Sequence, residues 1–338
     1  MSARRPWAWP LVPVYAAALA LKERLRSSGI LSTRKLQWPV VSVGSVSAGG
    51  AGKTPVVIAL ATMLKQRGWS IDILSRGYGR EGLGIELVDT EEDAAAKRFG
   101  DEPTLIGQRT HLPVWVGSDR FAAGQRAEAA SAEEQIAQGL HLLDDGFQHR
   151  KLARTVDIVL VTAEDIDDAL LPAGNLREPL SVLGRADFVV IRQEETEAIG
   201  SRVQQLMRRD AQLWTIRRKL RFPAPLFVFG AGLRPIAFCA IARPAGFASM
   251  LIEAGCGIVE TVFFGDHHAY AMADIDRIIE VAKELNATGL VTTEKDAVKL
   301  TTAMREKLEA AGPLMVAELE VEFIFPERVM RELETRLV

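Results

Sequence analysis

The chain has 338 residues, enough for two domains, and its 48% hydrophobic and 25% charged residues are the proportions of a folded globular protein. This composition excludes disordered, fibrous and low-complexity classes, and no internal repeat indicates a solenoid. The net charge of −3 is small, but a strongly basic N-terminus lies within it. The two cysteines, Cys239 and Cys256, lie in apolar runs without C-x-x-C spacing, which predicts two buried thiols in a reducing compartment.

Residues 1–35 form a basic, partly apolar N-terminal segment. They hold seven Lys/Arg and one acidic residue, a formal charge of +6, so the remainder carries about −9. Residues 6–21 are uncharged, but they are fewer than the roughly 20 needed to span a bilayer. Because Trp7, Trp9 and Tyr15 are residue types that settle at headgroup depth, we expect the segment to lie on an anionic membrane surface.

Two alternatives for this segment stay open at this point. Ala18-Leu19-Ala20 could imitate the cleavage site of a secretory signal, and the apolar stretch could instead be a core helix of the first domain. A nucleic acid is a poor partner for the basic charge, because no stacking pattern or reader motif accompanies it.

Apolar runs typical of buried strands alternate with helical patterns along the rest of the chain. This alternation predicts an α/β fold with a mostly parallel sheet that helices cover on both faces. The expected strands are 39–44, 71–75, 114–117, 140–143, 155–161 and 188–191, with helices at 54–67 and 119–130.

A basic, proline-bearing segment around residues 214–225 interrupts the alternation, and we expect the domain boundary there. The first domain would be 36–218 and the second, smaller α/β domain 219–338, closing over the active-site cleft. The second domain is expected to contain strands at 236–241, 258–264, 289–292 and 314–321, with helices at 247–254 and 273–286.

The segment between the first strand and the first helix of the 36–218 domain reads as a phosphate-binding P-loop. Backbone N–H groups at such a helix N-terminus cradle phosphate oxygens. Lys53 would neutralise the β- and γ-phosphates of ATP, and the Thr54 hydroxyl would bind Mg²⁺. The strict motif is missed by one residue, because Ser47 stands where glycine is usual. The loop residues are Ser47, Ala48, Gly49, Gly50, Ala51, Gly52, Lys53 and Thr54.

A P-loop needs a second anchor for Mg²⁺, an acidic residue at the end of a buried strand. Asp144 and Asp145 follow the apolar strand 140–143. Asp144 is expected to be the metal-linked carboxylate, with Asp145 as its partner, since adjacent carboxylates repel unless a cation intervenes.

Seven short segments, in this order along residues 40–300, give the chain a resemblance to the tetraacyldisaccharide 4′-kinase family, the lipid A 4′-kinases. The N-terminal apolar segment also looks like that family's membrane-associated helix. The seven are Val43–Val46 continuing through Gly52–Pro55, Ser75–Arg80, Gly100–Pro103, Asp144–His149, Leu176–Pro179, Asp266–His268 and Thr293–Asp296.

The resemblance implies a P-loop kinase that uses Mg²⁺ and ATP. It implies transfer of the γ-phosphate to the 4′-hydroxyl of an acylated disaccharide 1-phosphate, at the cytoplasmic face of the inner membrane, by a peripheral or monotopic enzyme. No obligate protein partner is indicated. The alternatives are a P-loop kinase of a small soluble metabolite and a nucleotide-switched partitioning or metallochaperone ATPase.

The resemblance also assigns roles that residue types alone leave open. An aspartate opening a helix is usually a cap, but the family's proposed base lies in the motif that holds Asp101, and His267 matches the histidine that partners it. The two would meet across the cleft between the domains. Glu294, Lys295 and Asp296 would support the site. The expected substrate-binding residues are Arg76, Tyr78, Arg120 and Arg177, because guanidinium groups grip phosphate.

Overall fold

The structure is a computed structural model that describes residues 5–30, 32–136, 138–223 and 234–337. Arg4 of the basic N-terminus and residues 224–225 of the basic segment lie outside the described residues. The chain divides into two compact units, and each is built from separate pieces of sequence. Unit 1 holds Met1–Arg76, Gly117–Arg217 and Val321–Val338, and unit 2 holds Gly77–Val116 and Arg218–Glu320.

This division differs from the expected pair of consecutive domains. The chain passes from unit 1 to unit 2 between Arg217 and Arg218, where the sequence indicated a domain boundary. The segment 77–116, expected in the first domain, belongs to unit 2, because its helix α4 (Asp101–Thr110) packs against α10 (Glu294–Ala297). The C-terminal segment belongs to unit 1, where Trp214 Nε1 donates to Glu332 of α12 at 2.7 Å.

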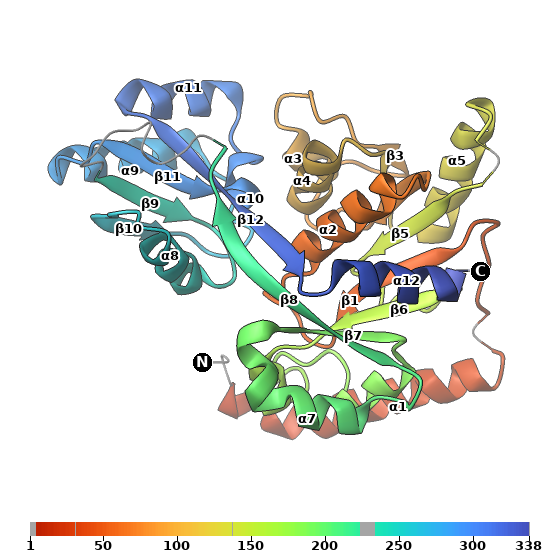
Figure 1. Cartoon of the computed structure of the whole chain (residues 1–338). Coiled ribbons are helices and arrows are strands. Elements are labelled where there is room, and N and C mark those ends of the chain that lie inside the picture. The colour runs from red at the N-terminus through yellow and green to blue at the C-terminus, as the bar shows by residue number, and fades with distance from the viewer. Residues whose placement is uncertain (1–4, 31, 137, 224–233, 338) are drawn as a thin grey trace. The chain divides into compact units, whose positions relative to one another are not determined.

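Unit 1 is a parallel sheet in the order β8-β7-β6-β1-β5-β2. Helix α2 packs against β1 and β5, and α7 lies on the opposite face (Figure 1). A buried cluster that includes Phe147, Val159 and Ile199 joins the sheet to α7. The strands are β1 Val40–Ser45, β2 Ile71–Ser75, β5 Leu140–Asp144, β6 Val156–Leu160, β7 Phe188–Arg192 and β8 Gln212–Arg221, of which β8 belongs to unit 1 up to Arg217.

The helices of unit 1 include a long N-terminal one, α1, drawn in red in Figure 1. None of the residues of α1 is buried, which contradicts the core-helix alternative. The helices are η1 Pro6–Leu11, α1 Val12–Ser27, α2 Lys53–Gln66, α5 Arg120–Glu133, α6 Ala163–Ile166, η2 Leu180–Arg185, η3 Gln193–Glu195, α7 Thr196–Leu206 and α12 Pro326–Leu337.

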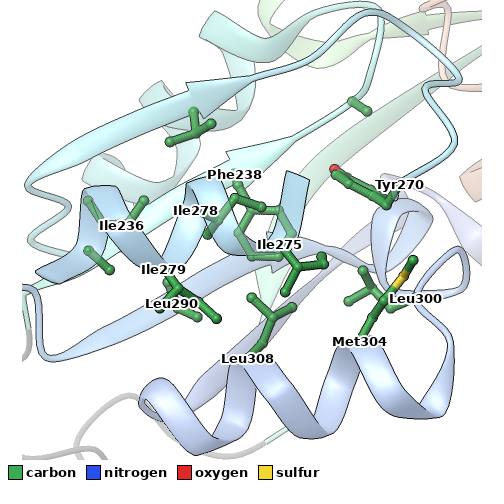
Figure 2. Close-up of a cluster of buried hydrophobic side chains, with 13 residues drawn as sticks. Ile236, Phe238, Tyr270, Ile275, Ile278, Ile279, Leu290, Leu300, Met304 and Leu308 are labelled. Atoms are coloured by element: carbon green, nitrogen blue, oxygen red, sulfur yellow. The ribbon is translucent and has the colours of Figure 1, made fainter. Parts of the chain in front are cut away.

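Unit 2 has a parallel sheet in the order β10-β9-β11-β12, with α8 on one face and α9 and α11 on the other (Figure 1). Its main core packs Phe238 and Tyr270 against α9 and α11 (Figure 2). The strands are β9 Pro235–Cys239, β10 Glu260–Phe263, β11 Gly289–Thr293 and β12 Leu314–Phe323, of which β12 belongs to unit 2 up to Glu320.

The segment Gly77–Val116 adds an antiparallel pair of short strands and two helices to unit 2.

The expected buried thiols are confirmed: Cys239 and Cys256 are free and buried, and burial raises the pKa of Cys239 to about 12. The remaining elements are β3 Glu86–Leu87, β4 Val114–Val116, α3 Ala95–Phe99, α4 Asp101–Thr110, α8 Pro244–Glu253, α9 Met272–Glu284, α10 Glu294–Ala297 and α11 Thr302–Ala311.

Candidate active site

The loop between β1 and α2 has the backbone of a phosphate cradle. Gly49, Gly50 and Gly52 have φ of 77°, 66° and 87°, a left-handed region that L side chains rarely occupy. Gly52 is the N-cap of α2, so Lys53 and Thr54 begin the helix. Ser47 is not among the described residues with positive φ, which explains why this loop does without the first glycine of the strict motif.

Lys53 is buried at the start of α2 and faces polar oxygens. Its Nζ lies 3.4 Å from Ser45 Oγ and 3.5 Å from Asp145 Oδ1. Only 9% of the Lys53 side chain is exposed, so its charge acts in a medium where water screens weakly. An anion placed in the loop would therefore meet a cation that burial and the neighbouring carboxylate hold in position.

The two aspartates at the end of β5 have different partners. Val43 of β1 is in register with Asp144, so the aspartates lie at the same sheet edge as the P-loop. Asp144 Oδ2 accepts a hydrogen bond from Ser75 Oγ at 3.1 Å. Asp145 pairs with Lys53 and, at 2.8 Å, with Arg177.

Asp145 also carries backbone strain, since its φ of 48° is in the left-handed region. Burial alone would raise the pKa of Asp145, but the charges of Lys53 and Arg177 outweigh it and hold the pKa below the usual range. A strained, ionised carboxylate between two cations points to a binding site rather than a simple strand end.

These groups fit Mg²⁺ better as a nucleotide-bound ion than as an ion in a protein cage. Residues 5–30, 32–136, 138–223 and 234–337 contain no group of three His, Cys, Asp or Glu residues able to hold a metal. Thr54 and Asp144 supply one hydroxyl and one carboxylate, and Mg²⁺ takes such oxygens together with phosphates and water. Asp145 already pairs with two cations, so Asp144 is the better candidate for a metal ligand.

Arg120 is the most unusual of the expected anion-binding arginines. It is the first residue of α5 and only 6% exposed, and its Nη1 donates to the Ser118 carbonyl at 3.0 Å, while its Nε has no hydrogen-bond partner among the described residues. Burial, with a smaller effect of nearby Arg76, lowers the pKa of Arg120 to about 10. The carboxylates of Asp145, Asp144 and Asp119 offset part of the cost of burying this cation, and its small number of hydrogen bonds leaves it a candidate anion-binding residue.

The other two expected arginines differ from Arg120 in exposure. Arg177 is half-buried and occupied with Asp145, whereas Arg76 is exposed at the end of β2. Sequence reasoning did not single out Gln148, whose Nε2 donates to the Ser45 carbonyl at 2.9 Å and whose Oε1 accepts from Arg177. Its position in the same segment as Asp144 was the available signal.

In unit 2, Asp101 and His267 form a direct pair. His267 Nδ1 lies 2.9 Å from Asp101 Oδ2. Both residues belong to unit 2, so the expectation that they meet across a cleft between two domains is wrong. The misassignment follows from the segment 77–116, whose place in unit 2 depends on long-range packing that the sequence does not reveal.

Asp101 is not the cap that its position first suggested. Gly100 is the N-cap of α4, with φ of 102°, and Asp101 is the first helical residue. One oxygen of Asp101 accepts from the Glu102 N–H at 2.9 Å, and the other faces His267. A Cβ on Gly100 would lie only 3.1 Å from the Cα of Gly77, so glycine allows the 77–80 turn to pass beside α4.

His267 is held in a demanding conformation, with φ of 58°. Tyr78 lies edge-on to its ring at 5.6 Å between centroids. The hydrogen bond with Asp101 raises the pKa of His267 against the effect of burial. For Asp101, burial would raise the pKa, but His267 and Lys295 outweigh it and lower the pKa.

Asp296 of α10 contacts the turn that leads to this pair. Asp296 is fully buried and accepts from the Ala240 N–H at 3.0 Å and from Tyr270 Oη at 3.1 Å. The His267 N–H in turn donates to the Ala240 carbonyl at 3.3 Å. Asp296 therefore fixes the turn that carries His267. Adjacent His268 pairs with Asp274 at 2.9 Å, away from Asp101, which agrees with a structural role.

The N-terminal segment exposes large apolar side chains on the surface of unit 1. Trp7 is 75% exposed and Val14 is 67% exposed. Tyr15 Oη donates to the Arg177 carbonyl at 2.9 Å, so α1 also contacts the segment that carries a candidate anion-binding arginine. None of the helices in the described residues combines the length and hydropathy that a transmembrane span requires.

Comparison with known proteins gives a consistent answer. A family model described as tetraacyldisaccharide-1-P 4′-kinase (LpxK) matches residues 4–338. The tetraacyldisaccharide 4′-kinase of Koribacter versatilis is 40% identical over 298 residues, covering 86% of this chain and 88% of the relative. That of Neisseria meningitidis is 35% identical over 297 residues, covering 86% and 82%. The crystal structure of LpxK from Aquifex aeolicus in complex with ATP has 29% identity and a TM-score of 0.76, covering 98% of both chains.

Proposed function

This chain belongs to the tetraacyldisaccharide 4′-kinase family, and we propose that it transfers the γ-phosphate of ATP to the 4′-hydroxyl of a tetraacyldisaccharide 1-phosphate. The observation that carries this proposal is the Asp101–His267 contact of 2.9 Å, a carboxylate–imidazole pair suited to a hydroxyl proton. The family assignment decides against a small-metabolite kinase and against a partitioning or metallochaperone ATPase.

In the proposed reaction, the 4′-oxygen forms a bond to the γ-phosphorus while the bond from that phosphorus to the β–γ bridging oxygen breaks. ADP leaves with the bridging electron pair, and the hydroxyl proton passes to the Asp101 carboxylate, with His267 sharing it. A sugar hydroxyl is weakly acidic, so a carboxylate that accepts its proton late in transfer lowers the barrier.

We assign ATP to the P-loop of unit 1, from Ser47 to Thr54. The left-handed glycines aim backbone N–H groups at the phosphates, and Lys53 neutralises their charge. Thr54 and Asp144 would hold Mg²⁺, which supplies neutralisation of the β- and γ-oxygens when bound. Asp145 would orient Lys53 and Arg177, given its contacts with both.

Three arginines are the candidate binders of the phosphate groups that Lys53 does not contact. Arg120, Arg177 and Arg76 can bind the polyphosphate of ATP or the 1-phosphate of the disaccharide, because planar guanidinium groups grip phosphate oxygens in pairs. Tyr78, beside His267, would contact the acceptor sugar. The N-terminal segment would hold the enzyme on the anionic inner membrane surface, at the cytoplasmic face where ATP is available.

The direct test is transfer of ³²P from γ-labelled ATP to purified tetraacyldisaccharide 1-phosphate, followed by thin-layer chromatography. The full-length protein should yield a doubly phosphorylated lipid, and Lys53→Ala and Asp101→Ala should each yield almost none. Transfer to water alone, with no labelled lipid, would contradict the proposal.

A further inference from the structure

Helix α4 is held by two adjacent residues of α10, at its two ends. At its N-terminal end, Lys295 Nζ lies 3.0 Å from Glu102 Oε1 and 3.7 Å from Asp101 Oδ2. At its C-terminal end, Arg109 pairs with Glu294, which also accepts the Leu319 N–H at 2.9 Å. Asp101 therefore sits on a helix whose placement depends on α10 rather than on a flexible loop.

Lys295 also faces the imidazole of His267. Its Nζ lies 3.5 Å from His267 Nε2, and Asp266 Oδ2 lies 3.9 Å from the same nitrogen. An ammonium group only donates hydrogen bonds. A donor at Nε2 favours the tautomer in which Nε2 carries the lone pair and Nδ1–H donates to Asp101.

Resting on the proposed function, we infer that Lys295 is a positioning residue that keeps Asp101 ionised and keeps Nε2 of His267 free of a proton. The Asp101–His267 pair then carries a single proton before reaction and can take up the proton of the acceptor hydroxyl. Without the Lys295 ammonium, the pair would bind a second proton in the resting enzyme. It could then no longer accept the proton of the acceptor hydroxyl.

The charges around the pair support this role. The other charged groups that act on Asp101 or His267 are the cations Lys295 and Lys299 and the anion Asp266, and Glu102 pairs with Lys295. Lys299 is engaged with Asp296 at 2.7 Å. Lys295 is therefore the cation that contacts both members of the pair, and its own pKa is raised by Glu102 and Asp101 despite its burial.

The test compares Lys295→Met with Lys295→Arg in the full-length protein. Lys295→Met removes the positive charge and should raise the protonation midpoint of the pair by roughly one to three pH units. The acidic limb of the kcat profile should move to higher pH by a similar amount, and Lys295→Arg should restore it. Lys307→Met is the matched control, because Lys307 pairs with Asp276 at the surface of the same unit.

Glu102→Gln provides a change of opposite sign. It removes a carboxylate beside Lys295 and Asp101, so the acidic limb should move to lower pH. A merely structural role for Lys295 would lower activity at every pH without moving the limb. If Lys295→Met is unstable, Lys295→Gln tests the same loss of charge with a polar side chain.

NMR titration of histidine-labelled protein separates this inference from the proposed function. A raised His267 midpoint in Lys295→Met, with a matching shift of the kcat limb, supports both. A raised midpoint with an unmoved kcat limb supports the role of Lys295 but removes the pair from the chemistry. An unchanged His267 midpoint in a folded Lys295→Met protein overturns the inference.

Discussion

His267 Nδ1 lies 2.9 Å from Asp101 Oδ2, although 166 positions separate the two residues in sequence. The backbone positions of both residues are fixed by neighbouring structure. Asp101 begins the first turn of α4. His267 has a left-handed backbone conformation, and its turn is held by Ala240, whose N–H donates to Asp296. A pair held this way behaves as one unit rather than as two independent side chains.

This relationship predicts non-additive losses. Asp101→Ala should lower kcat by roughly 10²- to 10⁴-fold, the usual contribution of acid–base catalysis, with little change in ATP affinity. His267→Ala should cost less, and the double variant should be little worse than Asp101→Ala alone. Steady-state kinetics with varied ATP and varied lipid measures this. Losses that multiply would mean that the two residues act separately.

Lys53→Ala and Thr54→Ala should each reduce kcat by about 10²- to 10³-fold, because each removes a group that stabilises charge at the transferring phosphate. Circular dichroism should be unchanged, since α2 keeps its other helical residues and the Lys53 Nζ contacts two polar oxygens, at 3.4 Å and 3.5 Å. Lys65→Ala, in the last turn of the same helix, is the control and should retain activity. Near-normal kcat in Lys53→Ala would move the nucleotide site elsewhere.

The sequence predicted correctly the strand before the glycine-rich loop 47–54 and the helix after it, because local patterns decide them. Glycines with positive φ, an apolar strand before them and a helix after them are all readable within 30 residues. The strand β8 was less readable, because its basic residues from Arg217 onward resembled a linker. Its alternating exposure, with Trp214 and Ile216 buried, accounts for the strand.

The assignment of residues 77–116 to unit 2 could not be predicted from local pattern. It rests on contacts such as Arg109 with Glu294 and Thr302 with Asp93, which join positions about 200 residues apart. For the same reason, the pairing of Asp145 with Arg177 was not foreseen. In the 77–116 segment and in the Asp145–Arg177 pair, tertiary packing determines which side chains come into contact.

Point substitutions, rather than a deletion, can test whether the N-terminal segment binds the membrane. Because Tyr15 contacts the Arg177 carbonyl, removing residues 1–22 would disturb the site as well as the surface. Trp7→Ser with Trp9→Ser changes two exposed rings instead. The double variant should bind anionic vesicles more weakly and raise KM for the lipid more than for ATP.

Flotation with phosphatidylglycerol vesicles at low and high salt measures this binding. Leu83→Ser is a matched control for the loss of an exposed apolar side chain, since Leu83 is 90% exposed on unit 2. Equal flotation of the wild-type and double-tryptophan proteins would remove the segment from membrane binding.

His149 should affect stability at acidic pH rather than catalysis. Burial, with a smaller effect of Arg120, lowers the pKa of His149 to about 4. Between about pH 4 and 6.5, His149 is protonated in the unfolded chain but neutral in the folded protein. This residue therefore lowers the free energy of unfolding as the pH falls through that range. His149→Gln should therefore reduce the difference in Tm between pH 5 and pH 7.5. A difference as large as in the wild type would contradict a neutral, half-buried histidine.

Arg120 should show opposite effects on stability and activity. Its side chain is buried with one carbonyl contact, and the described residues place no carboxylate in a salt bridge with it. Burying a cation without a salt-bridge partner costs free energy, and an apolar side chain at the same place removes that cost. Arg120→Met should therefore raise Tm by several degrees while it lowers kcat/KM by about 10²-fold, as expected for a lost phosphate contact.

Two further variants separate charge from geometry. Arg120→Lys keeps the positive charge but loses the planar fork, so it should recover only part of the activity. Arg126→Met, at an exposed position on the same helix, should change neither activity nor Tm appreciably. A lower Tm with normal kcat/KM in Arg120→Met would identify Arg120 as a structural residue that holds the start of α5, and the phosphate would then have to be bound by Arg76 and Arg177.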